Sequence, residues 1–236
     1  DDLYYSYGYY FVKIHVTPSN VDRIYIYGVP MLTSSDGGET FTTLDAPNAH
    51  VDHHALWINP SNPKHLINGN DGGVNISYDG GENWMKSNQP SVGQFYTVYA
   101  DEQTPYHVYG GLQDNGVWEA AHTSRESVAW QQSGHNNWTG IMGGDGMQIQ
   151  VDKNNANIVY TGYQFGNYFR INRETKKRTY IQPKHKLGEA PLRFNWQTPI
   201  LLSPHNNDIL YFGSNKLHRS LNRGDEWTTI SEDLTK

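Results

Sequence analysis

The chain of 236 residues contains no cysteine, which excludes disulfide frameworks, thiolate metal sites and cysteine nucleophiles. No apolar run approaches the ~18 residues that a membrane-spanning helix needs. Basic residues are fewer than acidic ones, 18 against 24, and they form no evident cluster. Nucleic acid is therefore not expected as a partner, and no membrane span is expected.

Long helices are also not expected, because 23 glycines and 11 prolines punctuate the chain throughout. Aromatic residues make up 13% of the sequence, and 17 of them are tyrosines. That content argues against disorder despite a mean hydropathy of −0.74. The length fits one large all-β domain or two small domains.

One unit recurs five times in the sequence: an apolar strand, a Pro/Asn/Asp turn, a second apolar strand that ends in glycine, and a third strand. The closing glycines are 41, 41, 52 and 51 residues apart, at Gly28, Gly69, Gly110, Gly162 and Gly213. Units of ~40–50 residues with about four strands are typical of β-propeller blades. We predict an all-β propeller segment of about five four-stranded antiparallel blades, at about 1–45, 46–90, 91–140, 141–190 and 191–236.

A second pattern, Ser-x-Asp/Asn-x-Gly-x-x-aromatic, ends the third strand of three units. In such a hairpin the Asp or Asn accepts backbone N–H groups, the glycine supplies a positive φ, and the aromatic ring fills the gap between blades. We interpret these residues as structural. They are Ser34, Asp36, Gly38 and Phe41; Ser77, Asp79, Gly81 and Trp84; and Ser220, Asn222, Gly224 and Trp227.

These turns resemble Asp-boxes, or BNR repeats, which occur in sialidases, xyloglucan-active glycosidases, sortilin-type receptors and non-enzymatic propellers. Five further segments are similar to long secreted bacterial BNR proteins labelled glycosyl hydrolase or sortilin (Vps10)-like: residues 5–11, 51–60, 69–73, 110–116 and 194–199. The resemblance implies a secreted or cell-surface bacterial protein. It further implies that this chain is a segment of a propeller with seven or more blades, so that the rest of a longer chain or a cell-surface assembly is its partner.

Polar and aromatic residues gather in the loops predicted for one mouth of the propeller. The loop that enters the innermost strand of a blade and the loop between strands two and three emerge on the same side. Carboxylates and amides pair with sugar hydroxyls, and aromatic rings stack on sugar faces, so this mouth is a candidate polysaccharide site. Its predicted ligand-binding residues are Asp52, His53, His54, Asn70, Gln113, Asn115, Trp196 and Gln197.

Three aspartates in these loops are candidate catalytic residues. A glycosidase needs two carboxylates about 5–5.5 Å apart for retention or about 6.5–9.5 Å apart for inversion. Asp71, Asp114 and Asp145 are the candidates, with Asp52 as a fourth. In xyloglucan-active propellers that this chain resembles, a catalytic Asp occupies a position like that of Asp71. The structural alternative is that Asp71 and Asp114 are turn residues, as Asp-Gly and Asp-Asn-Gly usually are.

Residues 50–54 contain three histidines and one aspartate, which indicates either a metal site or hydrogen-bonding histidines at a blade junction. No cofactor is required, although calcium or another divalent ion held by the same loops is an alternative. Sialidase chemistry is disfavoured because only Arg193, of eight arginines, falls in a mouth loop.

Two other segments are interpreted as structural. Residues 175–178 are read as a solvated hairpin tip, and residues 119–129 as a short helix or an irregular outer strand with an insertion. The sequence leaves two functions open. The first is binding of a polysaccharide, with or without hydrolysis. The second is a sortilin-like protein- or peptide-binding or structural scaffold without catalysis.

Overall fold

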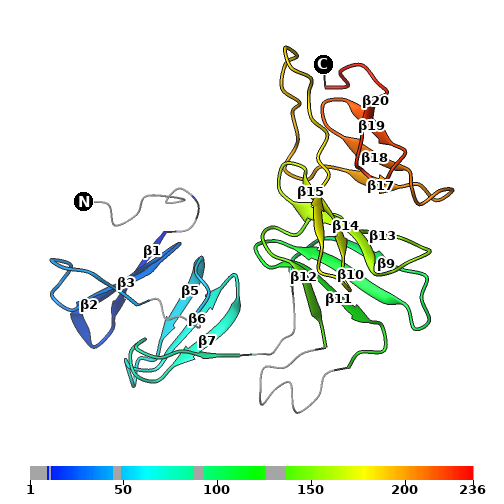
Figure 1. Ribbon diagram of the computed structural model, residues 1–236. Helices are drawn as coiled ribbons and strands as arrows, with labels where there is room; N and C mark the ends of the chain where they lie inside the picture. The colour runs from blue at the N-terminus through cyan, green and yellow to red at the C-terminus, as the bar shows by residue number, and fades with distance from the viewer. Residues whose placement is uncertain (1–9, 11, 45–48, 88–92, 126–136, 236) are drawn as a thin grey trace. The chain divides into compact units, whose positions relative to one another are not determined.

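The computed structural model describes residues 10, 12–44, 49–87, 93–125 and 137–235, and it contains five four-stranded antiparallel sheets (Figure 1). Each sheet is a meander in which strands neighbour one another in chain order. This confirms the predicted all-β class built of four-stranded antiparallel blades. The described residues include no helix long and apolar enough to cross a bilayer. The chain divides into two compact units, Asp1–Val92 and Gly93–Lys236, which are described separately.

The first unit contains two sheets that share one core. The first sheet comprises β1 (Lys13–Thr17), β2 (Asn20–Tyr27), β3 (Met31–Ser34) and β4 (Thr42–Thr43), and the second comprises β5 (His53–Ile58), β6 (Leu66–Asn70), β7 (Gly73–Ser77) and β8 (Met85–Lys86). Their facing side chains form a single buried cluster of Tyr25, Tyr27, Met31, Leu56, Ile58, Leu66 and Trp84. Tyr25 and Tyr27 of β2, and Leu56 and Ile58 of β5, are alternate residues that face this core, as the period of a β-strand requires.

The second unit contains three sheets. They are β9 (Phe95–Ala100), β10 (His107–Leu112), β11 (Gly116–Ala121) and β12 (Thr139–Met142); β13 (Gln150–Val151), β14 (Ile158–Tyr163), β15 (Asn167–Asn172) and β16 (Arg178–Tyr180); and β17 (Ile200–Leu202), β18 (Leu210–Gly213), β19 (Leu217–Ser220) and β20 (Thr228–Thr229). One buried cluster joins the third and fourth sheets of the chain, and another joins the fourth and fifth. Consecutive sheets therefore pack face to face, as propeller blades do.

The helical alternative for residues 119–129 is wrong for the described part of that segment. Glu119 and its two successors complete strand β11, and residues 126–129 lie outside the described residues. The Glu119 side chain is 5% exposed and pairs with His107 Nδ1 of β10 at 2.5 Å and with the Arg173 guanidinium. A carboxylate that meets two cationic or hydrogen-bonding partners across the sheet favours the extended strand over a local helix.

The three Ser-x-Asp/Asn-x-Gly turns share one hydrogen-bond pattern. In the second turn, Ser77 Oγ accepts the Gly81 N–H at 2.9 Å, and Asp79 Oδ1 accepts the Asn83 N–H at 2.9 Å. The first and last turns repeat both contacts with their equivalent residues. The fifth residue of each pattern, a glycine, has a φ of +88° to +97°. Each turn is thus closed by its own side chains.

The aromatic residue of two turns anchors the neighbouring sheet. Trp84 is 4% exposed within the core of the first unit. Trp227 packs against the cluster between the fourth and fifth sheets, and its Nε1 donates to the Ile181 carbonyl at 2.7 Å. The turn therefore connects local hairpin geometry to packing between sheets.

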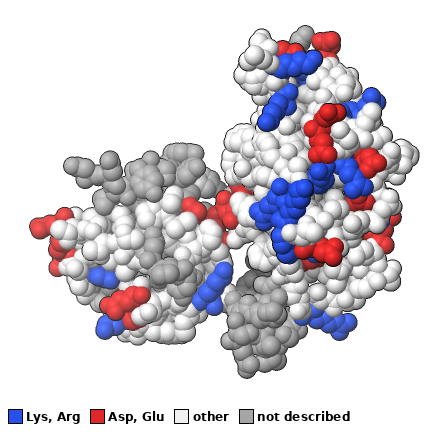
Figure 2. All heavy atoms as spheres, viewed as in Figure 1, with Lys and Arg blue, Asp and Glu red and all other residues white. Residues whose placement is uncertain are grey.

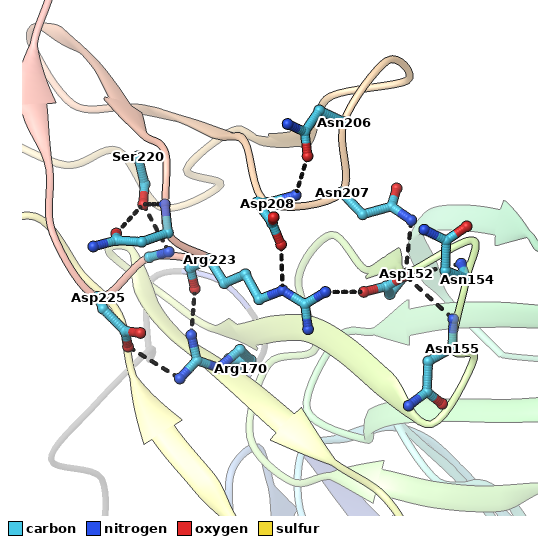
Figure 3. Close-up of polar contacts among 12 residues, drawn as sticks. Asp152, Asn154, Asn155, Arg170, Asn206, Asn207, Asp208, Ser220, Arg223 and Asp225 are labelled. Atoms are coloured by element: carbon cyan, nitrogen blue, oxygen red, sulfur yellow. Dashed lines mark hydrogen bonds and ion pairs between the residues drawn. The ribbon is translucent and has the colours of Figure 1, made fainter.

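A polar network also joins the fourth and fifth sheets beside the last of these turns (Figure 3). Arg223 Nε donates to Asp208 at 2.7 Å, and the same guanidinium lies 3.4 Å from the buried Asp152 carboxylate. Arg170 of β15 donates to the Arg223 carbonyl at 2.9 Å and pairs with Asp225 at 3.0 Å. These contacts hold the strand-three turn of the fifth sheet on the fourth sheet.

Candidate functional site

The mouth loops are defined here as the connections that enter the first strand of a sheet and those that join its second and third strands. In the second unit, backbone hydrogen bonds connect these loops directly. Gln113 N–H donates to the Gln94 carbonyl at 3.0 Å, and Phe165 N–H donates to the Trp196 carbonyl at 3.2 Å. Mouth loops of the second unit are therefore in direct contact within the third sheet and between the fourth and fifth sheets.

Asp145 ties two of these loops together. Its Oδ1 accepts the backbone N–H of Asp114 at 2.7 Å, and its Oδ2 accepts Gln164 Nε2 at 2.5 Å. The residue is 4% exposed. With both oxygens engaged and little access to solvent, this carboxylate is suited to holding the loops in place rather than to meeting a ligand.

Asp114 lies next to Asp145 but is exposed, in the turn between β10 and β11. Its backbone adopts a φ of +57°, a conformation that Asp and Asn tolerate better than most residues. Asn115 is exposed as well, and its Nδ2 donates to the Gln113 carbonyl at 2.9 Å. The structure thus brings Asp114, Asp145, Gln113 and Asn115 together and presents Asp114 and Asn115 to solvent.

Aromatic residues cover the adjoining part of this surface. Phe165 and Trp196 are 51% and 41% exposed and meet edge to face, with ring centroids 5.3 Å apart. Trp196 Nε1 donates to the Tyr96 hydroxyl at 3.3 Å. Burial raises the pKa of Tyr96, and the Asp145 and Asp114 charges add to that rise, so this phenol stays protonated beside the two carboxylates. Gln197 is exposed next to the pair.

Phe165 is a surface residue that the predicted ligand set omits. It precedes Gly166 in the turn after β14 and has a φ of +59°. The repeat could have identified Phe165, because it lies in the turn between strands two and three of the fourth sheet, and Asp114 lies in the equivalent turn of the third sheet. A large apolar residue held at positive φ on the surface is uncommon, and such residues cluster at functional sites.

The first unit contains the other group of predicted residues. His54 Nε2 lies 2.6 Å from Asp71 Oδ1, and the two side chains are 42% and 31% exposed. Burial raises the pKa of Asp52, the Asp71 charge raises it further, and the three neighbouring histidines oppose the rise. This places a carboxyl with a raised pKa beside a second carboxylate that a histidine contacts.

His53 and Asn70 are buried rather than presented to solvent. His53 is 2% exposed, and its Nδ1 lies 2.8 Å from Nδ2 of the buried Asn68. The Asn70 amide donates to the His50 carbonyl at 2.7 Å. Within the described residues, no three His, Asp or Glu side chains are grouped closely enough to hold a metal ion.

Arg193, the arginine predicted in a mouth loop, is engaged by the last described residues of the chain. Its Nη2 donates to Asp233 at 2.8 Å, and the Asn215 amide donates to the same carboxylate at 2.9 Å. Hydrogen bonds from Asn215, Thr235 and Arg193 lower the pKa of Asp233 below its usual range. The guanidinium therefore already has an anionic partner within the chain.

Solved structures provide partial similarities. The chain is similar over 93% of its length to 38% of a GH74 xyloglucanase from Xanthomonas campestris, with 15% identity and a TM-score of 0.42. It is similar over 92% to 38% of a GH74 enzyme from Niastella koreensis, with 16% identity and a TM-score of 0.39. It is also similar over 91% to 66% of YCF48 bound to D1 peptide, with 10% identity and a TM-score of 0.39.

The chain thus spans well under half of the two GH74 enzymes. TM-scores below 0.5 do not establish a common fold, so the architecture described above rests on the five sheets themselves. No protein-family profile matches the sequence, and no curated protein matches it.

Proposed function

We propose that the protein binds a polysaccharide on the mouth loops of its second unit. The observation that carries this proposal is the exposed Phe165–Trp196 pair beside Asp114, Asn115 and the Tyr96 hydroxyl. Aromatic rings offer apolar faces to the C–H faces of sugars, and carboxylate and amide groups accept and donate hydrogen bonds to hydroxyls. A surface that exposes both kinds of group suits a sugar, which has apolar C–H faces and polar hydroxyl groups.

A hydrolytic step is proposed separately, for the first unit. Asp52 has a raised pKa and lies close enough to Asp71 for that charge to contribute, while His54 contacts Asp71. An acid with a raised pKa beside a second carboxylate is the arrangement that glycoside hydrolysis uses. Asp52 then protonates the leaving oxygen, and Asp71 acts as the base or nucleophile.

Binding is tested by affinity electrophoresis of the wild-type chain through gels that contain plant, algal or microbial polysaccharides. Trp196→Ala is expected to weaken retention about tenfold, since an exposed aromatic anchor contributes about 1.4 kcal/mol. Trp57→Ala is the matched control, because Trp57 is 47% exposed but belongs to β5 of the other unit. Equal losses in both variants, or no retention by any polysaccharide, would refute the proposal. Retention by peptides alone would favour a protein-binding scaffold instead.

Hydrolysis is tested on any polysaccharide that is retained, by release of reducing ends. Asp71→Asn and Asp52→Asn are each expected to abolish release while leaving retention unchanged. If Asp52 is the acid, kcat/KM falls as pH rises through its raised pKa, because the proton it donates is lost. Turnover that survives in both variants would exclude this pair as the catalytic residues.

A further inference from the structure

A pocket of about 580 Å³ opens in the second unit between β12 and the hairpin that joins β15 to β16. Its lining combines polar backbone and side-chain groups with basic residues. Its polar and charged lining residues include Thr139, Asn157, Arg173, Glu174, Lys176 and Arg178. This volume is in the range of small-molecule sites.

The pocket lies at the opposite strand ends from the mouth loops. It is formed at the connection between strands three and four of the fourth sheet, where the first, second and fifth sheets have their Ser-x-Asp/Asn-x-Gly turns. The fourth sheet has Arg173, Lys176 and Arg178 there instead. Residues 175–178, predicted to be a solvated hairpin tip, are exposed at the hairpin between β15 and β16, and Lys176 and Arg178 also line this pocket.

Two of the three basic side chains are held in place. Arg173 pairs with the buried Glu119, and its guanidinium lies 6.0 Å from the centre of the Tyr109 ring. Arg178 Nη2 donates to the Ile141 carbonyl at 3.2 Å. Each guanidinium has five N–H donors, so these contacts orient the groups and leave further donors for a ligand.

Lys176 supplies a charge without a counterion. Among the described residues no hydrogen bond or ion pair of its ammonium is found, and the side chain is exposed. Its backbone has a φ of +60°, a conformation in which glycine or asparagine is less strained than lysine. A lysine at this position suggests that the side chain is needed.

The pocket is positively charged although the whole chain carries a formal charge of −6. Three cations and one acid, Glu174, line it. Figure 2 shows several basic side chains, with acidic side chains among them, on the face of the second unit that this view presents. Arg173 is already paired with the buried Glu119, so Lys176 and Arg178 supply the excess of positive charge over Glu174 that attracts an anion.

We propose that this pocket binds a tetrahedral oxyanion, a sulfate or phosphate group that is either free or carried on an anionic polysaccharide. Planar guanidinium groups bind such oxygens in pairs, and the lysine contributes a point charge. Thr139 and Asn157 at the rim add neutral donors. The site is independent of polysaccharide binding at the mouth loops, because none of the residues of those loops lines it.

The test compares binding of inorganic sulfate, inorganic phosphate, dextran sulfate and neutral dextran by isothermal titration calorimetry. Lys176→Asn removes the charge while suiting the positive φ, so it is expected to fold normally. Alone or with Arg178→Gln, it is expected to weaken oxyanion binding at least tenfold. Lys64→Asn is the charge-matched control, since Lys64 is exposed in the other unit. Binding of the wild-type chain should weaken as salt is raised.

The titrations with free ions and with dextran sulfate distinguish a small anion from an anionic polysaccharide as the ligand. Binding of dextran sulfate without the free ions identifies an anionic polysaccharide, and binding of the free ions alone identifies a small anion. Affinity that is unchanged in Lys176→Asn, or reduced equally in Lys64→Asn, overturns the proposal, as does absence of binding to every anion. Trp196→Ala should leave this binding intact, so a failure of the mouth-loop proposal is visible separately.

Discussion

Asp114 and Asp145 are close in space and of the same residue type, but they have different roles. Asp145 is buried and accepts hydrogen bonds from two other loops, whereas Asp114 is exposed and donates its backbone N–H to Asp145. The sequence around each, Gln-Asp-Asn-Gly and Gly-Asp-Gly, marks both equally as turn residues. Burial separates the carboxylate that organises the surface from the one that can meet a ligand.

This difference predicts different effects on stability. Asp145→Asn places an amide NH₂ where one of two N–H donors now points, and leaves a buried donor unpaired, so we expect a loss of about 1–3 kcal/mol. Asp114→Asn should change stability by less than about 0.5 kcal/mol, because the site is exposed and Asn tolerates a positive φ. Urea unfolding of the two variants measures the difference. Equal destabilisation would show that Asp145 does not hold the loops.

At the scale of elements, the Ser-x-Asp/Asn-x-Gly turns are hairpins closed by their own side chains. Asn222 takes the place of the aspartate in the last turn and still accepts the Glu226 N–H at 2.9 Å. In the second turn, hydrogen bonds from Asn83 and Ser77 lower the pKa of Asp79 to about 2. The acceptor oxygen is thus common to all three turns, and the charge is an addition in two of them.

Asp79→Asn is therefore expected to destabilise the chain less than Asp79→Ala, because the asparagine keeps the acceptor oxygen. The lowered pKa also sets the sign of the pH effect. The charge stabilises the fold above the unfolded-state pKa of about 3.9, and that contribution is lost as pH falls toward 2. Thermal unfolding between pH 2 and pH 6 should show a smaller pH dependence for Asp79→Asn than for the wild type. Identical pH profiles would mean that the charge contributes nothing.

At the scale of the whole molecule, the edge strand β1 of the first unit has apolar side chains exposed to solvent. Ile14 and Val16 on β1 are 63% and 48% exposed. They are paired in register with Ile26 and Ile24 of β2, so the four side chains share the face opposite to the buried cluster. An uncovered apolar row of this kind promotes association with another surface.

Ile14→Lys combined with Val16→Lys is expected to lower the weight-average mass of the chain at high concentration. Light scattering over a concentration series measures this. Val21→Lys is the control, because Val21 is 75% exposed and lies outside the paired registers of β2. If the double variant and the control associate as the wild type does, this face has no part in self-association.

The repeat and the turn signature were sufficient to predict the all-β class and the four-stranded antiparallel sheets. Strand alternation, the Pro/Asn/Asp turns and the closing glycines are local properties, so they can be seen in the sequence without knowledge of packing. The alternative that failed, a helix at residues 119–129, failed at Glu119, whose partners His107 and Arg173 lie 12 and 54 residues away.

For the candidate site residues, too, local sequence determined some properties and long-range contacts determined others. The sequence by itself determined which loops carry Asp, Asn, Gln and aromatic residues, because strand order assigns each loop to one end of a sheet. Only the tertiary structure decided that Asp145 and His53 are buried, that Phe165 and Trp196 form an exposed pair, and that Arg173, Lys176 and Arg178 line a pocket. Those outcomes depend on contacts between residues far apart in the chain, where burial and charge are set by neighbours that local sequence does not specify.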